Sequence, residues 1–258
     1  YYIRQIMTIA DELFEHTIIK EMELHQNKEY AKHHQKFFKT GKGEYGEGDI
    51  FIGLTVPEIR KIVKNHTDLP FSDIQKLLNS KIHEHRFAGL VILVNKYQKA
   101  KKDEALKEKI YKFYLKNTHN INNWDLVDVS CHKIVGEYLL ESISTYSNDH
   151  NDNINILYKL AKSDNLWEKR ISIISTFAFI RKNNFHHALK ISEILLNDKH
   201  DLIHKAVGWM LREIGKRNKK ILEEFLEKYA QTMPRTMLRY AIEKFDKESR
   251  AYYLKKIK

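Results

Sequence analysis

Apolar residues recur every three or four positions along almost the whole chain, which is the spacing of one face of an α-helix. Only three prolines and nine glycines interrupt the pattern. No segment shows the alternation of apolar and polar residues that is typical of a strand. The pattern therefore predicts an all-α protein. Its first apolar stripe consists of Ile3, Ile6, Met7, Ala10, Leu13 and Phe14.

From residue 82 onward the predicted helices come in pairs, joined by the short polar connections that antiparallel neighbours require. Thr55 and Ser72, followed three residues later by Glu58 and Gln75, predict capping boxes at the starts of two earlier helices. The pairs are 82–98 with 102–117, 123–141 with 152–162, 165–182 with 186–196, 201–217 with 219–231, and 235–245 with 247–257.

No linker or break in composition divides the chain. We therefore expect one domain over residues 1–258, with capping helices and a glycine-rich loop in 1–80 and paired-helix repeats in 81–258. The glycine-rich segment 41–46 reads Gly-Lys-Gly-Glu-Tyr-Gly and matches the letters of a dinucleotide-binding fingerprint. It follows a helical segment and no strand, so we reject that match. A plain connector is favoured over a backbone contact to phosphate.

Two series of residues share a period close to 42 residues. A period of this length is typical of paired-helix repeats of the HEAT type, in which each repeat presents the same helix face to one concave surface. We therefore expect an α–α superhelix, a solenoid of HEAT-like repeats with a concave basic groove. The first series has intervals of 42 and consists of Arg86, Asp128, Arg170 and Arg212. The second contains all three tryptophans, Trp124, Trp167 and Trp209, at intervals of 43 and 42.

The chain is basic, with 45 lysines and arginines against 34 acidic residues and a formal net charge of +11. Excess positive charge favours a polyanionic partner, most commonly nucleic acid, although lysines also simply keep proteins soluble. The chain has a single cysteine, Cys131, which excludes a disulfide framework and indicates an intracellular protein. We expect a cytoplasmic location, with association to the nucleoid when nucleic acid is bound. We expect the Cys131 thiol to be packed and inert. No apolar run approaches the roughly 18–20 residues of a membrane span, so we expect no membrane association.

The tryptophans share helix faces with the charged series. Asn123 is a good N-cap, which places Trp124 at the start of a helix with Asp128 one turn later on the same face. Arg170 and Arg212 each follow a tryptophan by three residues. Guanidinium groups pair with phosphates and indole rings pack on sugars or bases, so this arrangement suits nucleic acid. The alternatives are core packing for a tryptophan, expected above all for Trp167, and a salt bridge between Asp128 and an arginine of a neighbouring repeat.

A single carboxylate limits the chemistry. Glycoside cleavage normally uses two, one as the acid for the leaving group and one as nucleophile or base. The acid is unnecessary when the leaving group is already cationic, as in an N-alkylated purine. One fixed aspartate can then stabilise the oxocarbenium-like sugar and position water, while aromatic faces favour a cationic, dry environment. Asp128 with tryptophan neighbours is therefore sufficient for cationic lesions and insufficient for neutral ones.

Five segments, in order, resemble signature segments of the DNA alkylation repair enzyme family (AlkD-like, with HEAT-like repeats). The resemblance implies a DNA glycosylase that releases cationic N3- and N7-alkylated purines from double-stranded DNA with the lesion left in the base stack. By position it implies that Asp128 is the catalytic residue, that Trp124 and Trp209 surround the lesion's sugar, and that Arg170 and Arg212 contact phosphates. Asn123 departs from members that carry an aromatic residue there, which bears on substrate range. The segments are 51–57, 123–128, 163–170, 205–213 and 235–245.

We add Lys205, in the segment of Trp209, and Arg86, the first residue of the charged series, as predicted DNA contacts. We expect a monomer without a cofactor. We also expect no metal site, since the histidine pairs lack cysteine partners and a zinc-binding pattern. The alternatives are a non-catalytic repeat protein that binds damaged or branched DNA and, less favoured, a protein-binding scaffold. Asp128 distinguishes the enzyme hypothesis from the DNA-binding hypothesis. An acid on a DNA-binding face repels phosphate, so its presence favours a catalytic role over binding alone.

Overall fold

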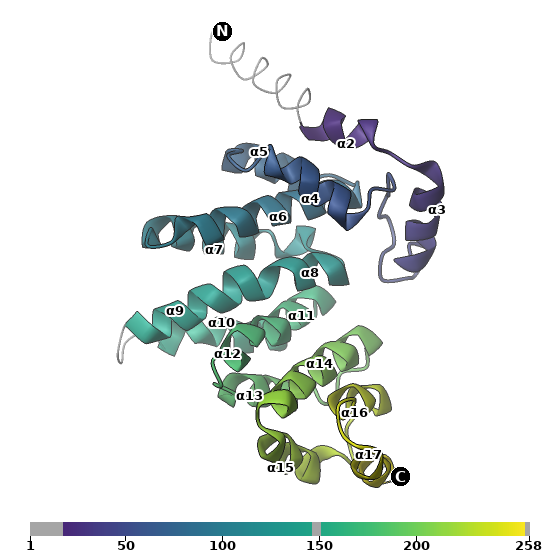
Figure 1. Cartoon of the computed structure of the whole chain (residues 1–258), viewed down its shortest axis with the longest axis vertical. Helices are drawn as coiled ribbons and strands as arrows, with labels where there is room; N and C mark the ends of the chain where they lie inside the picture. Colours follow the sequence, from purple (N-terminus) through teal and green to yellow (C-terminus); the bar gives the residue numbers. More distant parts are fainter. Residues whose placement is uncertain (1–17, 146–150, 256–258) are drawn as a thin grey trace. The chain divides into compact units, whose positions relative to one another are not determined.

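The computed structural model describes residues 18–145 and 151–255 (Figure 1). The predicted apolar stripe from Ile3 to Phe14 lies outside the described residues. Helices make up this part of the chain, and its one β contact is an isolated bridge between Ile50 and Ile82. The all-α helical-repeat prediction is confirmed. The chain divides into two compact units, Tyr1–Leu126 and Val127–Lys258, which are described separately.

Unit 1 is built around α6 (His83–Ala100), which packs against α4 (Val56–Lys64), α5 (Phe71–Leu78) and α7 (Glu104–Lys116) (Figure 1). Residues on every side of α6 are buried, as expected of a helix with neighbours all round. The other elements of the unit are α2 (Lys20–Leu24), α3 (Lys28–Phe37), the short η2 (Thr118–Asn120) and the first residues of α8 (Trp124–Cys131).

One predicted capping box is confirmed and the other is wrong. The Glu58 carboxylate accepts hydrogen bonds from the backbone N–H and the hydroxyl of Thr55, both at 2.7 Å, at the start of α4. The prediction for Ser72 fails because the preceding proline, Pro70, occupies the N-cap in an extended conformation, so Ser72 already lies in the first turn of α5. Gln75 instead donates to the amide oxygen of Asn117 at 2.6 Å.

The glycine-rich segment between α3 and α4 is a hydrogen-bonded connector. The Gly46 N–H donates to Lys39 O at 3.1 Å, and the Asn27 N–H donates to Ile52 O at 2.9 Å. Gly53 has a φ of +87°, and a Cβ there would collide with the backbone of Asn27, so only glycine fits. These contacts favour the connector interpretation over a phosphate loop.

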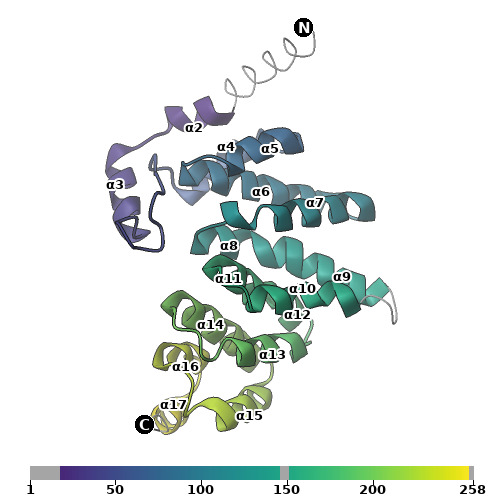
Figure 2. The same cartoon turned by 180° about the vertical axis from the view of Figure 1, so that it is seen from behind.

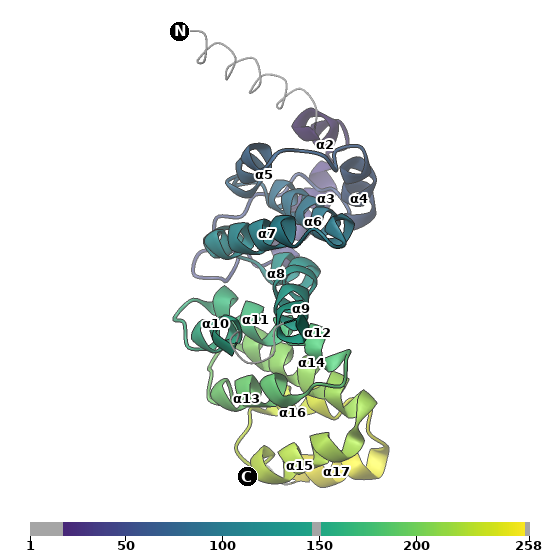
Figure 3. The ribbon, with the colours of Figure 1, turned by 90° about the vertical axis from the view of Figure 1, so that its left-hand side faces the viewer.

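Unit 2 consists of further helix pairs, and α10 packs on α11 and α13 within it (Figure 2). α14 lies between α11 and α16 (Figure 3). The elements after α8 are η3, a π-helical turn (His132–Gly136), α9 (Glu137–Thr145), α10 (Asn151–Ala161), α11 (Leu166–Ser175), α12 (Phe177–Ile180), α13 (His186–Ile194), α14 (Asp201–Arg217), α15 (Lys219–Tyr229), α16 (Arg235–Ala241) and α17 (Lys247–Lys255).

The predicted helix pairs are confirmed to within a few residues at most ends, with two differences. The predicted helix 123–141 contains the π-helical turn, where Gly136 lies so close to Ser175 O that a Cβ would not fit. The predicted helix 165–182 is interrupted at Thr176. The boundary between the two compact units lies inside α8, between Leu126 and Val127. The expectation of one domain, with capping helices up to residue 80 and repeats after it, stays a prediction.

Candidate functional site

The start of α8 is fixed by buried polar contacts in unit 1. The Asn123 side chain accepts the backbone N–H of Trp124 at 2.8 Å, so the helix begins where the sequence predicts. Asn123 is fully buried, and its amide N–H donates to Asp49 Oδ2 at 3.0 Å. Asp49 comes from the glycine-rich segment, which therefore anchors the helix that carries Trp124.

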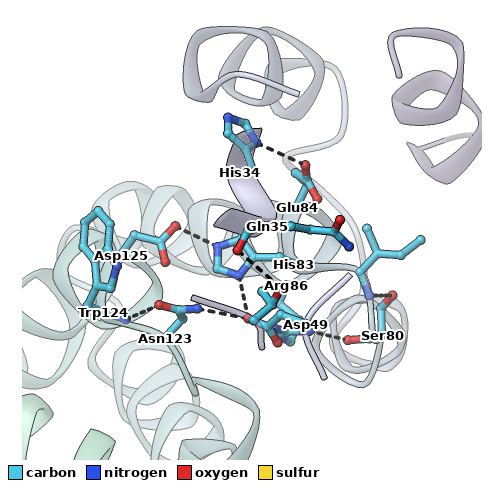
Figure 4. A network of polar contacts seen from close by, with 12 residues as sticks. His34, Gln35, Asp49, Ser80, His83, Glu84, Arg86, Asn123, Trp124 and Asp125 are labelled. Carbon is cyan, nitrogen blue, oxygen red and sulfur yellow. Dashed lines mark hydrogen bonds and ion pairs between the residues drawn. The ribbon is translucent and has the colours of Figure 1, made fainter. Parts of the chain in front are cut away.

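Asp49 belongs to a chain of buried charges (Figure 4). Arg86 Nη2 donates to Asp49 Oδ1 at 2.5 Å, and the His83 ring contacts Asp49 at 3.2 Å and Asp125 at 2.8 Å. Burial lowers the pKa of His83, but the charge and hydrogen bond of Asp125, with the hydrogen bond of Asp49, outweigh it and raise the pKa to about 9. His83 is therefore an imidazolium at neutral pH, donating from both ring nitrogens.

Arg86, a predicted DNA contact, is only 4% exposed. Besides Asp49 it donates to the backbone carbonyl of Ser80 at 2.8 Å. Its guanidinium is thus engaged inside unit 1, because a buried carboxylate requires a charged partner. This position gives the predicted phosphate contact no support.

Asp128 and Arg170 form a two-pronged ion pair in unit 2. Arg170 Nε and Nη2 donate to the two carboxylate oxygens of Asp128 at 2.9 and 2.8 Å, and Nη1 donates to Leu202 O at 2.6 Å. The Arg170 side chain is 6% exposed, whereas that of Asp128 is 21% exposed. The predicted salt bridge to an arginine one period away is therefore present, and Asp128 keeps a fixed orientation with part of its surface accessible.

The three tryptophans differ in burial as predicted. Trp167 is 8% exposed and belongs to the core, while Trp124 and Trp209 are half-buried. Trp209 packs against Phe177 at a ring-centroid distance of 6.0 Å. Phe177 also packs against His132, and burial lowers the pKa of His132 to about 4, so its ring is neutral.

The two predicted DNA contacts on α14 are more accessible than Arg170. Lys205 is 40% exposed and pairs with Asp201 at 2.6 Å. Arg212 is 19% exposed and pairs with Glu243. The Arg212 guanidinium also lies 3.6 Å from the Glu213 carboxylate. Both side chains are therefore already paired with carboxylates.

Cys131 is fully buried, and that burial raises the pKa of its thiol well above the usual value. The prediction of a packed, inert cysteine is confirmed for its packing. The described residues include no group of three or more histidine, cysteine, aspartate or glutamate side chains arranged to hold a metal ion. In the same residues, no helix combines the length and the apolar character needed to cross a membrane.

A sequence model of the DNA alkylation repair enzyme family matches residues 18–245. The chain belongs to this family. Among solved structures it is similar to one described as a predicted DNA alkylation repair enzyme from Enterococcus faecalis, with a TM-score of 0.62 and 17% identity over 86% of this chain and 97% of that one. At this identity the likeness concerns the fold. The comparison with curated proteins gave no match.

Several residues that contact predicted site residues or their neighbours in this DNA alkylation repair family member lay outside the sequence predictions. His83 stands 42 residues before Asp125, the interval that also separates Asp128 from Arg170, so the period itself contained a signal for both contacts. Asp49 lies in a segment without periodicity, and nothing in the sequence connects it to Asn123. Phe177 carries no distinguishing signal among the many aromatic residues.

Proposed function

We propose that this protein is a DNA glycosylase that releases cationic N3- and N7-alkylated purines from duplex DNA. The proposal is based on the fixed orientation and partial exposure of the Asp128 side chain. Two hydrogen bonds from Arg170 hold its carboxylate in one orientation, and part of the side chain remains exposed. Family membership supports a role in the repair of alkylated DNA.

In the proposed reaction the C1′–N9 bond of the alkylated purine breaks and its electron pair leaves with the base. The base, cationic before cleavage, departs neutral, and positive charge develops on the sugar. Asp128 stabilises that charge because its orientation needs no rearrangement during the reaction. Water adds at C1′ and its proton passes to Asp128 or to solvent. Trp209, in the same unit as Asp128, is proposed to supply an aromatic face, and Trp124 precedes Asp128 by one turn of α8.

Arg170 has a positioning role in this proposal. Its guanidinium is buried, and its hydrogen bonds go to Asp128 and to a backbone carbonyl. The phosphate contacts of the proposal therefore come from the more exposed Lys205 and Arg212.

The test is base release from duplex DNA treated with an alkylating agent, with the freed purines separated by chromatography. Wild type is expected to release methylated purines, and Asp128→Asn to lose at least about 100-fold in rate while keeping most DNA affinity. Asp164→Asn, the same change at an exposed position, is the matched control and should behave as wild type. Thermal unfolding checks that Asp128→Asn is folded, because Arg170 loses its charged partner.

The alternative function is non-catalytic binding of damaged or branched DNA. The observation in its favour is the same ion pair, since a structural salt bridge also explains an aspartate at this position. Intact DNA binding without base release by wild type would favour this alternative. Equal loss of binding and release in Asp128→Asn would count against a catalytic role for Asp128.

A further inference from the structure

Phe177 contacts three side chains from different parts of unit 2. The centroid of its ring lies 5.5 Å from that of His132 and 6.0 Å from that of Trp209. The Arg181 guanidinium lies over the same ring, 5.3 Å from its centroid. Phe177 is only half-buried, so it makes these contacts at the edge of the core, where the side chains of Asp128 and Trp209 are also partly exposed.

The interruption of the predicted helix 165–182 gives Phe177 its position. Thr176 is fully buried, and its hydroxyl donates to Ile173 O at 2.6 Å. A hydroxyl bonded to a carbonyl of its own helix commonly bends that helix. The chain then continues as α12, which packs against η3 and α14. Phe177, the first residue of α12, therefore lies between these two elements.

The η3 turn packs on the junction of α11 and α12 through a backbone contact. A Cβ on Gly136 would overlap Ser175 O and would lie 3.0 Å from the Ala178 Cβ, so only glycine allows this approach. Such a contact leaves little room for adjustment, because no side chain in it can rotate away. The two backbones therefore fix the distance between η3 and α12.

His132 joins the helix of Asp128 to Phe177. It begins η3 four residues after Asp128, so the two side chains project from the same side of the helix. The His132 ring is 8% exposed and meets the Phe177 ring at an interplanar angle of 71°, an edge-to-face geometry that paired rings prefer. Because burial lowers the pKa of His132 to about 4, the neutral ring packs without bringing a charge to this contact.

Phe177 is also the aromatic neighbour that orients Trp209. In the part of the chain that the structure describes, no other aromatic ring contacts the Trp209 indole. A tryptophan side chain rotates about two bonds, and Trp209 is only half-buried. The contact with Phe177 therefore restricts the orientation of the indole.

Arg181 restricts Phe177 in turn. Its side chain is 38% exposed and pairs with Glu137 of α9, so the guanidinium over the Phe177 ring is itself held in place. A guanidinium over a ring face is attracted by the electrostatic potential of the ring. This attraction opposes rotation of Phe177 away from its two aromatic neighbours.

We propose that Phe177 is a positioning residue, which together with His132 forms a spacer that holds the Trp209 indole at a fixed distance and angle from the Asp128 carboxylate. This inference rests on the proposed function, in which Asp128 stabilises the sugar and Trp209 supplies an aromatic face. Arg170 fixes the carboxylate, and the spacer fixes the indole. Both groups are thus arranged before DNA binds, which is the condition for efficient electrostatic stabilisation.

A double-mutant cycle tests whether Phe177 acts through Trp209. Phe177→Leu removes the ring and keeps an apolar side chain. We expect single-turnover base release to fall about tenfold through misplacement of the indole, with DNA affinity unchanged. In a Trp209→Leu background the same substitution should lower the rate no further, because there is no indole left to position. A tenfold loss in both backgrounds would overturn the proposal.

Two further variants separate positioning from a general loss of stability. Phe113 is also half-buried and contacts the Phe71 ring at 5.1 Å in unit 1, so Phe113→Leu is the matched control and should release base at the wild-type rate. Phe177→Tyr keeps the ring and should retain most of the rate. An equal loss in Phe113→Leu and Phe177→Leu, or in Phe177→Tyr and Phe177→Leu, would contradict a spacer formed by the ring.

Fluorine NMR of the full chain labelled with 5-fluorotryptophan observes the spacer without a reaction. The chain has three tryptophans, so three resonances are expected, and single Trp→Phe substitutions assign them. Phe177→Leu should shift and broaden the Trp209 resonance, because the indole then samples more than one orientation. The Trp167 resonance should stay as in wild type. An unchanged line width for Trp209 would overturn the proposal.

The spectrum requires no DNA, so the two proposals fail separately. A broadened Trp209 resonance in Phe177→Leu, with no base release by wild type, would support the spacer and reject the glycosylase. Base release by wild type that Phe177→Leu leaves unchanged would reject the spacer alone.

Discussion

The ion pair between Asp128 and Arg170 combines two properties that a carboxylate needs to stabilise a transient cation. The guanidinium fork fixes the plane of the carboxylate through both oxygens, and a lysine, as a single point of charge, does not. The two side chains differ in exposure, since the arginine is buried and the aspartate is partly exposed. Part of the Asp128 side chain is therefore accessible, although Arg170 binds both carboxylate oxygens.

Arg170→Lys tests whether this arginine positions Asp128 or contacts DNA. The variant keeps the charge and loses the fork, so we expect base release to fall about 100-fold through misplacement of the carboxylate. The dependence of DNA affinity on salt concentration should stay as in wild type. The measurements are single-turnover base release and binding at several salt concentrations with Arg170→Ala alongside. If Arg170→Ala lowers the salt slope by about one, Arg170 contacts a phosphate and the original prediction for it holds.

At the scale of the elements, the 42-residue period predicts which helices are neighbours. It does not predict which contacts their side chains make. It predicts neighbours correctly for Asp128 with Arg170, and the same interval joins His83 to Asp125. It does not predict that Arg86 points inward, because its partner, Asp49, lies in a loop outside the period. Helix boundaries depend on local spacing and were predictable from sequence, whereas the buried charges depend on a long-range contact that no local pattern encodes.

His83 makes the attachment of α8 dependent on pH. Burial and the charge of Arg86 lower the pKa of His83, but Asp125 and Asp49 outweigh both and raise it to about 9, against about 6.5 in an unfolded chain. A raised pKa means that the stabilisation is complete below about 6.5 and is lost as the pH rises through about 9. The part of the free energy of unfolding that depends on this titration is about 3 kcal/mol, from the difference between the folded and unfolded pKa values.

Urea unfolding between pH 6 and about 10 measures this effect. Wild type should lose stability in the upper half of that range. His83→Gln should be less stable at neutral pH and show little further loss at high pH, because the titrating group is gone. His186→Gln, at an exposed position, should follow the wild-type curve. A wild-type stability that does not change between pH 7 and 10 would show that His83 is not charged in the folded state.

At the scale of the whole molecule, positive charge is concentrated near the C-terminal end of the chain. Residues 212–258 contain 14 lysines and arginines and 7 acidic residues, which gives +7 of the total +11. This segment begins at Arg212, so a predicted phosphate contact stands next to the most basic part of the sequence. Long-range attraction to DNA should therefore depend on this segment more than on unit 1.

The salt dependence of DNA binding separates a specific contact from this general attraction. The logarithm of affinity falls linearly with the logarithm of salt concentration, and each lost phosphate contact lowers the slope by about one. We expect this change for Lys205→Ala and for Arg212→Ala, each measured on an undamaged duplex at four or more salt concentrations. Lys102→Ala removes the same charge from an exposed position in unit 1 and should leave the slope unchanged. If all three variants weaken binding equally, the DNA responds to the net charge of the chain and Lys205 and Arg212 make no specific contact.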